Sequence, residues 1–194
     1  DIDVIRGFHG RTGAAVAVHD LRPWRARLLN DVEAGPDGTL YVTDTGIIMS
    51  DAGVLYPRGD RVFAIAPDRT VRVIASGEQL SLPNGLQWDA RSGRLVIASF
   101  HPFTSEVYTL TTTGERNVIG TGPGRFDGLQ LLEDGRIVAA SWEDHSIHVF
   151  DGSAHYRIIT HLDQPAGLGV DTRRNRLLIP LVRPGTVELW QLDR

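Results

Sequence analysis

Short apolar runs alternate with turn residues along the whole chain, and one combination recurs four times. The copies read "LLNDVEAGPDGTLYVTD", "LPNGLQWDARSGRLVIAS", "FDGLQLLEDGRIVAAS" and "QPAGLGVDTRRNRLLIPL". Each holds an apolar run, a turn and a second apolar run, and an alternating strand follows, such as "RVFAIA" or "HSIHVF". The first three copies add one more strand. Alternation, β-branched residues and frequent turn signals predict strands throughout, with no helical stripe.

The repeat predicts an all-β fold, a β-propeller of four-stranded blades. Aligned positions 30, 84, 127 and 166 give a period of roughly 40–50 residues, which is typical of propeller blades. Successive blades are predicted at residues 28–75, 82–119, 125–160 and 164–192, and residues 1–20 read as the outer strands of a preceding blade. The prediction is a single partial propeller domain over 1–194, an incomplete arc lacking its N-terminal blade or blades. Missing blades or another chain would complete the ring.

The aligned positions are expected to face the central channel. Neighbouring strands of a blade run antiparallel, so the start of each innermost strand shares one face with the loop between the second and third strands. Those loops span residues 45–59, 101–105, 143–144 and 183–185, and the first is long and Gly-rich. We expect this long loop to cover part of the channel mouth as a lid. Asn30, Asn84 and Asp127 should point to one axial point from three blades, whereas the fourth blade carries Ala166.

Two amide oxygens and one carboxylate form a set of hard donors. Such donors suit Ca²⁺, Mg²⁺ or Mn²⁺, with waters completing the shell. The alternative is local: Asn-Gly and Asp-Gly are common turn formers, because their side chains bond nearby backbone. The common register of Asn30, Asn84 and Asp127 favours convergence, which a turn requirement does not predict.

Composition narrows the function further. The chain has 194 residues and a net charge of −4, with 20 basic residues, all of them Arg, and no Cys. No basic stripe indicates nucleic-acid binding, and no apolar run is long enough for a bilayer. Schiff-base lysines, thiol nucleophiles and Cys-ligated zinc are excluded within this chain. Composition and charge do not identify the cellular compartment of the protein.

The first three repeats resemble the gluconolactonase / regucalcin (senescence marker protein) family of six-bladed propellers, over about residues 28–192. The "PNGL" element is the most specific part of the resemblance. It implies one divalent cation in the channel, with Ca²⁺ as the first choice and Mg²⁺, Mn²⁺ or Zn²⁺ as alternatives. In the family a Glu, two Asn and an Asp hold the metal. The Asn pair corresponds to Asn30 and Asn84, and the Asp to Asp127, whereas the Glu belongs to a blade upstream of this chain.

The resemblance implies a metal-dependent hydrolase that acts on a lactone or related small ester. The metal would polarise the ester carbonyl, and Asp127 would be the catalytic base as well as a ligand. Candidate substrate contacts are His101, Arg125, Trp142 and Glu143, for which ordinary loop or packing roles are the alternative. The competing function is a non-catalytic, NHL-like propeller that binds a partner, because one fold hosts many functions.

Two histidines three residues apart, His145 and His148, have a spacing that would suit zinc on a helix. On a strand, however, residues i and i+3 point to opposite faces. We therefore predict structural roles for both.

Overall fold

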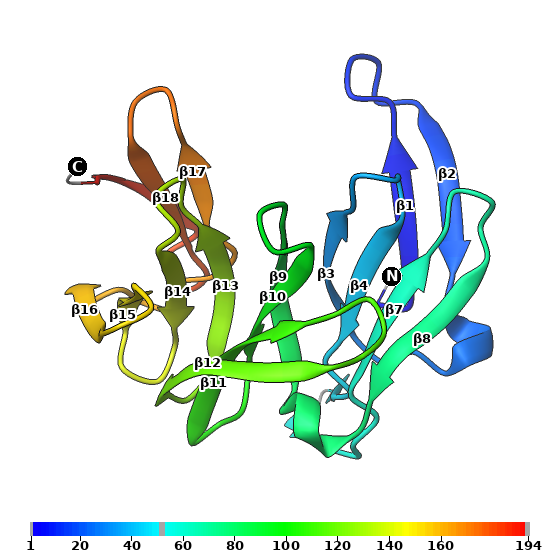
Figure 1. Ribbon diagram of the computed structural model, residues 1–194, viewed down its shortest axis with the longest axis horizontal. Coiled ribbons are helices and arrows are strands. Elements are labelled where there is room, and N and C mark those ends of the chain that lie inside the picture. Colours follow the sequence, from blue (N-terminus) through cyan, green and yellow to red (C-terminus); the bar gives the residue numbers. More distant parts are fainter. Residues whose placement is uncertain (1, 51–52, 193–194) are drawn as a thin grey trace.

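The chain folds into β-sheets arranged side by side as the blades of a propeller (Figure 1). The computed structural model describes residues 2–50 and 53–192. The first full blade joins β3 (Leu29–Ala34), β4 (Leu40–Asp44), β7 (Arg61–Ile65) and β8 (Val71–Ser76). The second joins β9 (Pro83–Asp89), β10 (Arg94–Ser99), β11 (Thr104–Leu110) and β12 (Arg116–Pro123). The third joins β13 (Phe126–Leu131), β14 (Ile137–Ser141), β15 (Ser146–Phe150) and β16 (His155–Ile159).

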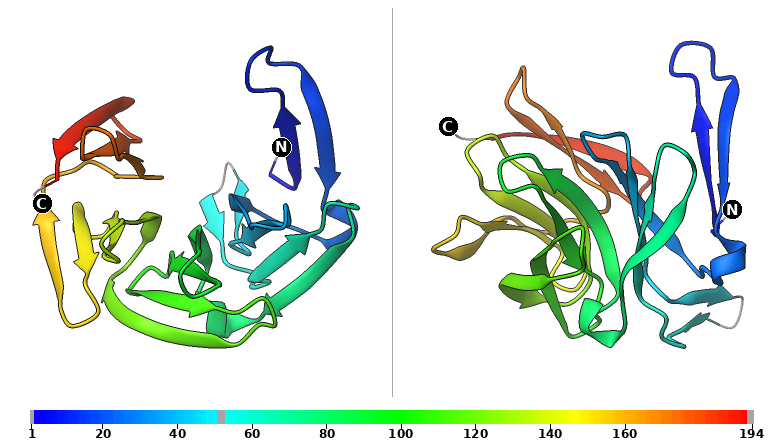
Figure 2. Two further views of the ribbon diagram at one scale, coloured as in Figure 1. Left: turned by 45° about the horizontal axis from the view of Figure 1, so that its top comes forward. Right: turned by 45° about the vertical axis from the view of Figure 1, so that its right-hand side comes forward.

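Smaller sheets lie at the two ends of the series. A two-stranded sheet, β1 (Val4–Phe8) and β2 (Ala15–Asp20), precedes the first full blade, and β17 (Gly169–Asp171), β18 (Arg176–Leu181) and β19 (Thr186–Gln191) form the last sheet. Figure 2 shows the sheets following one another around an open arc. The predicted all-β propeller fold and its arc are confirmed. Within the described ranges, no helix is long and apolar enough to span a membrane.

The core lies between neighbouring blades. Period-2 alternation places one apolar row of each strand against the next sheet, so Val62 and Ala64 of β7 pack with Leu95 and Ile97 of β10. These four side chains are 0–1% exposed, and full burial of one such aliphatic side chain contributes about 1.5–3 kcal/mol. Contacts between repeats therefore contribute to the stability of the fold.

Glycines let the innermost strands of neighbouring blades approach closely. Gly85 in β9 and Gly128 in β13 directly follow Asn84 and Asp127. A Cβ on Gly128 would lie 2.5 Å from the Cα of Gly167 in the next blade. Neither glycine has a positive φ. The turn-forming alternative for these dipeptides is therefore wrong, because both lie inside strands, and the glycine is needed for inter-blade packing.

The long segment between β4 and β7 contains a small hairpin. Its strands are β5 (Ile48–Ser50) and β6 (Gly53–Leu55). Residues 51 and 52, which belong to the predicted lid, lie outside the described residues. The hairpin leaves the sheet from the end that carries Asn30, because Thr45 is bonded to the Asn30 side chain.

Candidate functional site

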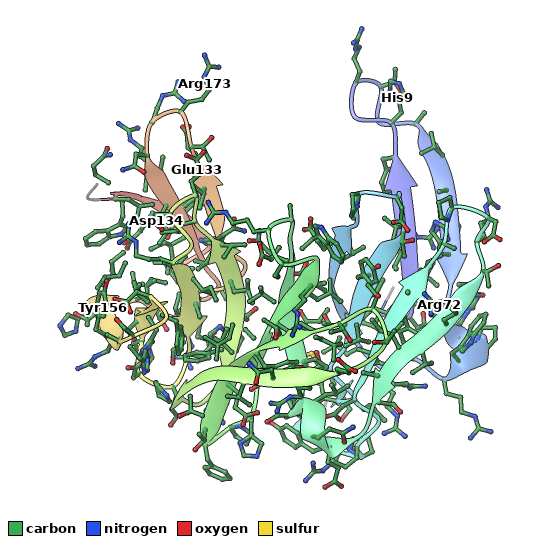
Figure 3. The ribbon with its side chains drawn as sticks, viewed as in Figure 1. His9, Arg72, Glu133, Asp134, Tyr156 and Arg173 are labelled. Carbon is green, nitrogen blue, oxygen red and sulfur yellow. The ribbon has the colours of Figure 1, made fainter. Side chains whose placement is uncertain are left out.

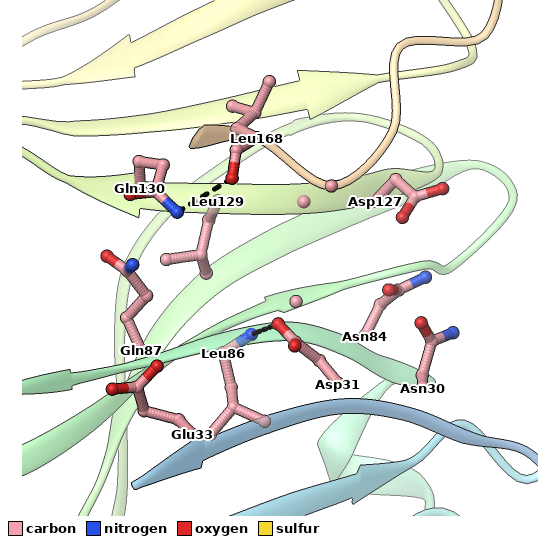
Figure 4. A pocket seen from close by; sticks show the side chains of 13 residues that line it. Asn30, Asp31, Glu33, Asn84, Leu86, Gln87, Asp127, Leu129, Gln130 and Leu168 are labelled. Carbon is pink, nitrogen blue, oxygen red and sulfur yellow. Dashed lines mark hydrogen bonds between the residues drawn. The ribbon is translucent and has the colours of Figure 1, made fainter. Parts of the chain in front are cut away.

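Asn30, Asn84 and Asp127 lie in one cavity, at the start of β3, β9 and β13. Figure 4 shows their side chains gathered at one end of it. The cavity has a volume of about 380 Å³. It is lined by three successive inner strands, β3, β9 and β13, and by the segment just before β17: Asn30, Asp31, Glu33, Asn84, Gly85, Leu86, Gln87, Asp127, Gly128, Leu129, Gln130, Gly167 and Leu168. Glu133 and Asp134 are not among the lining residues; they lie on the turn after β13 and are labelled in Figure 3.

The Asn30 amide has a fixed orientation. Its Nδ2 donates to the Oγ1 of Thr45 at 3.0 Å, and the Thr45 hydroxyl donates its own proton to the carbonyl oxygen of Pro83 at 2.8 Å. Because that proton is already used, Thr45 can only accept from Asn30. The Oδ1 atom of Asn30 is therefore left free of this contact and available to the channel.

The Asn84 side chain is buried, with 4% of the residue exposed. Its backbone carbonyl accepts a hydrogen bond from the Oγ1 of Thr43 at 2.6 Å. Its side-chain amide makes no hydrogen bond to any part of the chain that the structure describes. Neither amide atom is among the fully buried side-chain atoms that lack a partner, so the amide opens onto the cavity and is available there to a ligand or water.

Asp127 carries the most perturbed carboxylate of the cavity. Burial, followed by the nearby charge of Asp31, raises its pKa to about 7. The indole of Trp142 faces the carboxylate and lowers this pKa somewhat, but its Nε1 is too poorly aligned or too distant for a regular hydrogen bond and is a buried donor without a partner. A cation would offset the desolvated charge.

These donors fit a hard divalent cation. Amide and carboxylate oxygens are the ligands that Ca²⁺, Mg²⁺ and Mn²⁺ prefer, and three side chains leave positions for water and substrate. Over residues 2–50 and 53–192, no group of three or more His, Cys, Asp or Glu is arranged to hold a metal. A cation here would therefore depend on the two asparagine amides as well as on Asp127.

Two further acids of the cavity escaped sequence reasoning. Asp31 accepts a hydrogen bond from the backbone N–H of Leu86 at 2.8 Å, and burial raises its pKa. Burial, followed by the charge of Asp31, also raises the pKa of Glu33. Alternation along β3 could have indicated the pair, since Asp31 and Glu33 are two residues apart on one strand face.

The four predicted substrate contacts lie outside the cavity lining. Arg125 and Glu143 form an ion pair with each other. The Nδ1 of His101 accepts from the backbone N–H groups of Phe103 and Thr104, at 3.4 Å each. Trp142 is the one of the four whose side chain interacts with a predicted ligand, Asp127.

The two histidines three residues apart have different environments. The Nδ1 of His145 lies 3.0 Å from the carbonyl oxygen of Leu162. His148 is 3% exposed, and its Nε2 lies 3.0 Å from a carboxylate oxygen of Asp144 while its Nδ1 lies 2.7 Å from the Nε2 of His155. These contacts tie strands and loops of one blade together.

Fold and cavity together define a β-propeller protein with a polar site on its axis. The family model described as the SMP-30/gluconolactonase/LRE-like region matches residues 5–168. The chain belongs to this family, as the sequence predicted. No curated protein gives a significant match to the chain.

Solved structures share the fold at low sequence identity. A structure described as a putative gluconolactonase is 23% identical, with a TM-score of 0.61, over 87% of this chain and 61% of its own. A gluconolactonase from Xanthomonas campestris is 19% identical, with a TM-score of 0.68, over 88% of this chain and 60% of its own. A virginiamycin B lyase from Staphylococcus aureus is 10% identical, with a TM-score of 0.67, over 100% of this chain and 64% of its own. The chain thus spans less than two thirds of each.

Proposed function

We propose that the protein is a metal-dependent hydrolase of a lactone or related small ester, with the site in the axial cavity. The observation that carries the proposal is the meeting of Asn30, Asn84 and Asp127 in one cavity, where the Asn84 amide and the Asp127 carboxylate lack regular hydrogen bonds. Membership of the gluconolactonase-like family supports the reaction class.

Each residue has a chemical role in this proposal. Asn30 and Asn84 would offer amide oxygens, and Asp127 a carboxylate oxygen, to a divalent cation, which when bound supplies Lewis-acid polarisation of the ester carbonyl. An Asp127 carboxylate oxygen would also accept the proton of the attacking water. In the metal-free site the pKa of this group is about 7, and a bound cation would lower it and so keep the carboxylate in the ionised form that a base requires.

The charge of the cavity favours an uncharged substrate. Asp31, Glu33 and Asp127 all line it, and none of the lining residues is Arg or His. An anionic substrate would meet three carboxylates without a compensating side chain. Neutral lactones are therefore the expected class, ahead of phosphorylated or carboxylate-bearing ones.

The test is lactone hydrolysis and Ca²⁺ binding by Asp127→Ala, compared with Asp134→Ala. Asp134 is a matched control because it is a carboxylate on the turn at the other end of the same blade. We expect Asp127→Ala to abolish hydrolysis and weaken cation binding while the protein stays folded, and Asp134→Ala to retain both. Equal cation binding and hydrolysis in wild type and Asp127→Ala would reject the proposal in favour of a non-catalytic propeller.

A further inference from the structure

One hydroxyl group connects two of the proposed ligands across a blade boundary. The Oγ1 of Thr45 accepts from the Nδ2 of Asn30 at 3.0 Å and donates to the carbonyl oxygen of Pro83, the residue before Asn84, at 2.8 Å. Thr45 is 0% exposed. We propose that Thr45 is a positioning residue, which sets the amide orientation of Asn30 and the start of β9 so that both asparagine oxygens face one point. This inference rests on the proposed function.

The backbone around Thr45 is rigid enough for that role. Its own N–H donates to the carbonyl oxygen of Leu28 at 3.0 Å. The neighbouring Asp44 carboxylate accepts from the N–H groups of Leu28, at 3.0 Å, and Gly46, at 3.2 Å. The segment that carries Thr45 is therefore bonded twice to Leu28, two residues before Asn30, and is braced within itself by the Asp44–Gly46 contact. A fixed neighbour is what an orienting hydrogen bond requires.

Strand register identifies the residues that are equivalent to Thr45 in the other two full blades. Asp44, Ser99 and Ser141 each pair with the residue immediately before Asn30, Asn84 and Asp127, respectively. Thr45, Phe100 and Trp142 are the next residues along, so they occupy equivalent places. Trp142 interacts with the Asp127 of its own blade, as Thr45 does with Asn30.

Thr45 is therefore the one hydroxyl at this register among three blades. Among the three blades, the proposed ligand that is held by a hydrogen bond of its side-chain amide is Asn30, in the blade of Thr45. The same position supplies an aromatic ring in the other two blades, where Phe100 and Trp142 pack edge to face with centroids 5.2 Å apart.

The experiment compares Thr45→Val, Thr45→Ser and Thr39→Val. Valine keeps the shape and removes the hydroxyl, whereas serine restores it. Thr39 is the matched control: it is 6% exposed, its hydroxyl donates to Asp37 at 3.0 Å, and it lies immediately before β4, whereas Thr45 lies immediately after it. The first measurement is Ca²⁺ affinity by calorimetry. The second is the side-chain NH₂ resonance pair of Asn30 in the metal-free protein, which reports its orientation without a cation.

We expect Thr45→Val to weaken Ca²⁺ binding about tenfold or more, as for other residues that orient metal ligands. Thr45→Ser and Thr39→Val should stay near wild type. In an Asn30→Ala background, the loss caused by Thr45→Val should shrink, because the two residues act together. Unchanged affinity and an unchanged Asn30 resonance pair in Thr45→Val would overturn the inference.

The two readouts separate this inference from the proposed function. A wild type that binds no Ca²⁺, in which Thr45→Val still shifts the Asn30 resonances and Thr39→Val does not, would support the orienting role and reject the metal-dependent hydrolase. A wild type that binds Ca²⁺, in which Thr45→Val binds it equally, would reject the positioning role alone.

Discussion

Gly85 and Asp127, on neighbouring blades, are packed backbone to backbone: a Cβ on Gly85 would lie 2.6 Å from the carbonyl oxygen of Asp127. The side chain before this glycine, Asn84, is thereby brought beside the strand that carries the acid. The contact links packing to function, because the inner strands cannot separate without also moving the proposed ligands apart.

Gly85→Ala should destabilise the protein and weaken the site. The added methyl group would push the Asp127 strand outward, and such overpacking typically costs about 1–3 kcal/mol. Gly167 follows the repeat position of the fourth copy, and a Cβ there meets nothing within 4 Å. In the 194-residue chain, Gly167→Ala should therefore be tolerated. Urea denaturation of both variants checks this, and equal losses of stability in the two would contradict it.

The charge of Asp127 should make metal-free stability depend on pH. Its folded pKa, about 7, lies above the ordinary value of 3.8. The group therefore contributes stability that is fully present below pH 3.8 and is lost as pH rises through 7. Asp127→Asn removes this dependence, so its thermal stability relative to wild type should increase from pH 4 to pH 7 and then level off. Thermal melts in chelator across this range measure it, and a constant difference would argue against a buried carboxylate.

The exposed hairpin between β4 and β7 should influence substrate selection. Met49 and Leu55 are 64% and 57% exposed, on a hairpin that leaves the sheet beside Thr45. Replacing either one with Ser should change KM for lactones with apolar substituents by on the order of fivefold, since one lost apolar contact is worth about 1 kcal/mol. Phe8→Ser, at 59% exposure on β1, is the control. Identical KM values for every lactone tested would exclude a lid role.

The Asp144–His148–His155 chain should make the third blade sensitive to acid. Burial lowers the pKa of His148 from its ordinary 6.5, and burial followed by the charge of His148 lowers that of His155. Groups with depressed folded pKa values contribute stability that is present above pH 6.5 and lost as pH falls. His148→Gln should flatten the loss of stability between pH 6.5 and 5, whereas His9→Gln, on an exposed loop, should not. Parallel pH profiles of the two variants would disprove this role.

The alternating pattern and the repeat determined the architecture. Period-2 alternation indicates which residues of a strand share a face. Alignment of the four repeats then places corresponding residues at equivalent points of successive blades. Those two facts were enough to predict the strands, the arc and the grouping of Asn30, Asn84 and Asp127 in one cavity. All of this information is local or repeated along the chain, and so it can be read from the sequence.

The tertiary structure decided which side chains meet. Gly85 follows a polar residue as a turn glycine would, and only the distance between blades shows that it serves close packing. Thr45 reads as the end of a strand, and only the packing of its blade against β9 gives its hydroxyl Pro83 as a partner in addition to Asn30. The ion pair between Arg125 and Glu143, two candidate substrate contacts, likewise appears only in the folded chain. Such contacts join residues tens of positions apart, and their geometry follows from how blades pack, which no local pattern encodes.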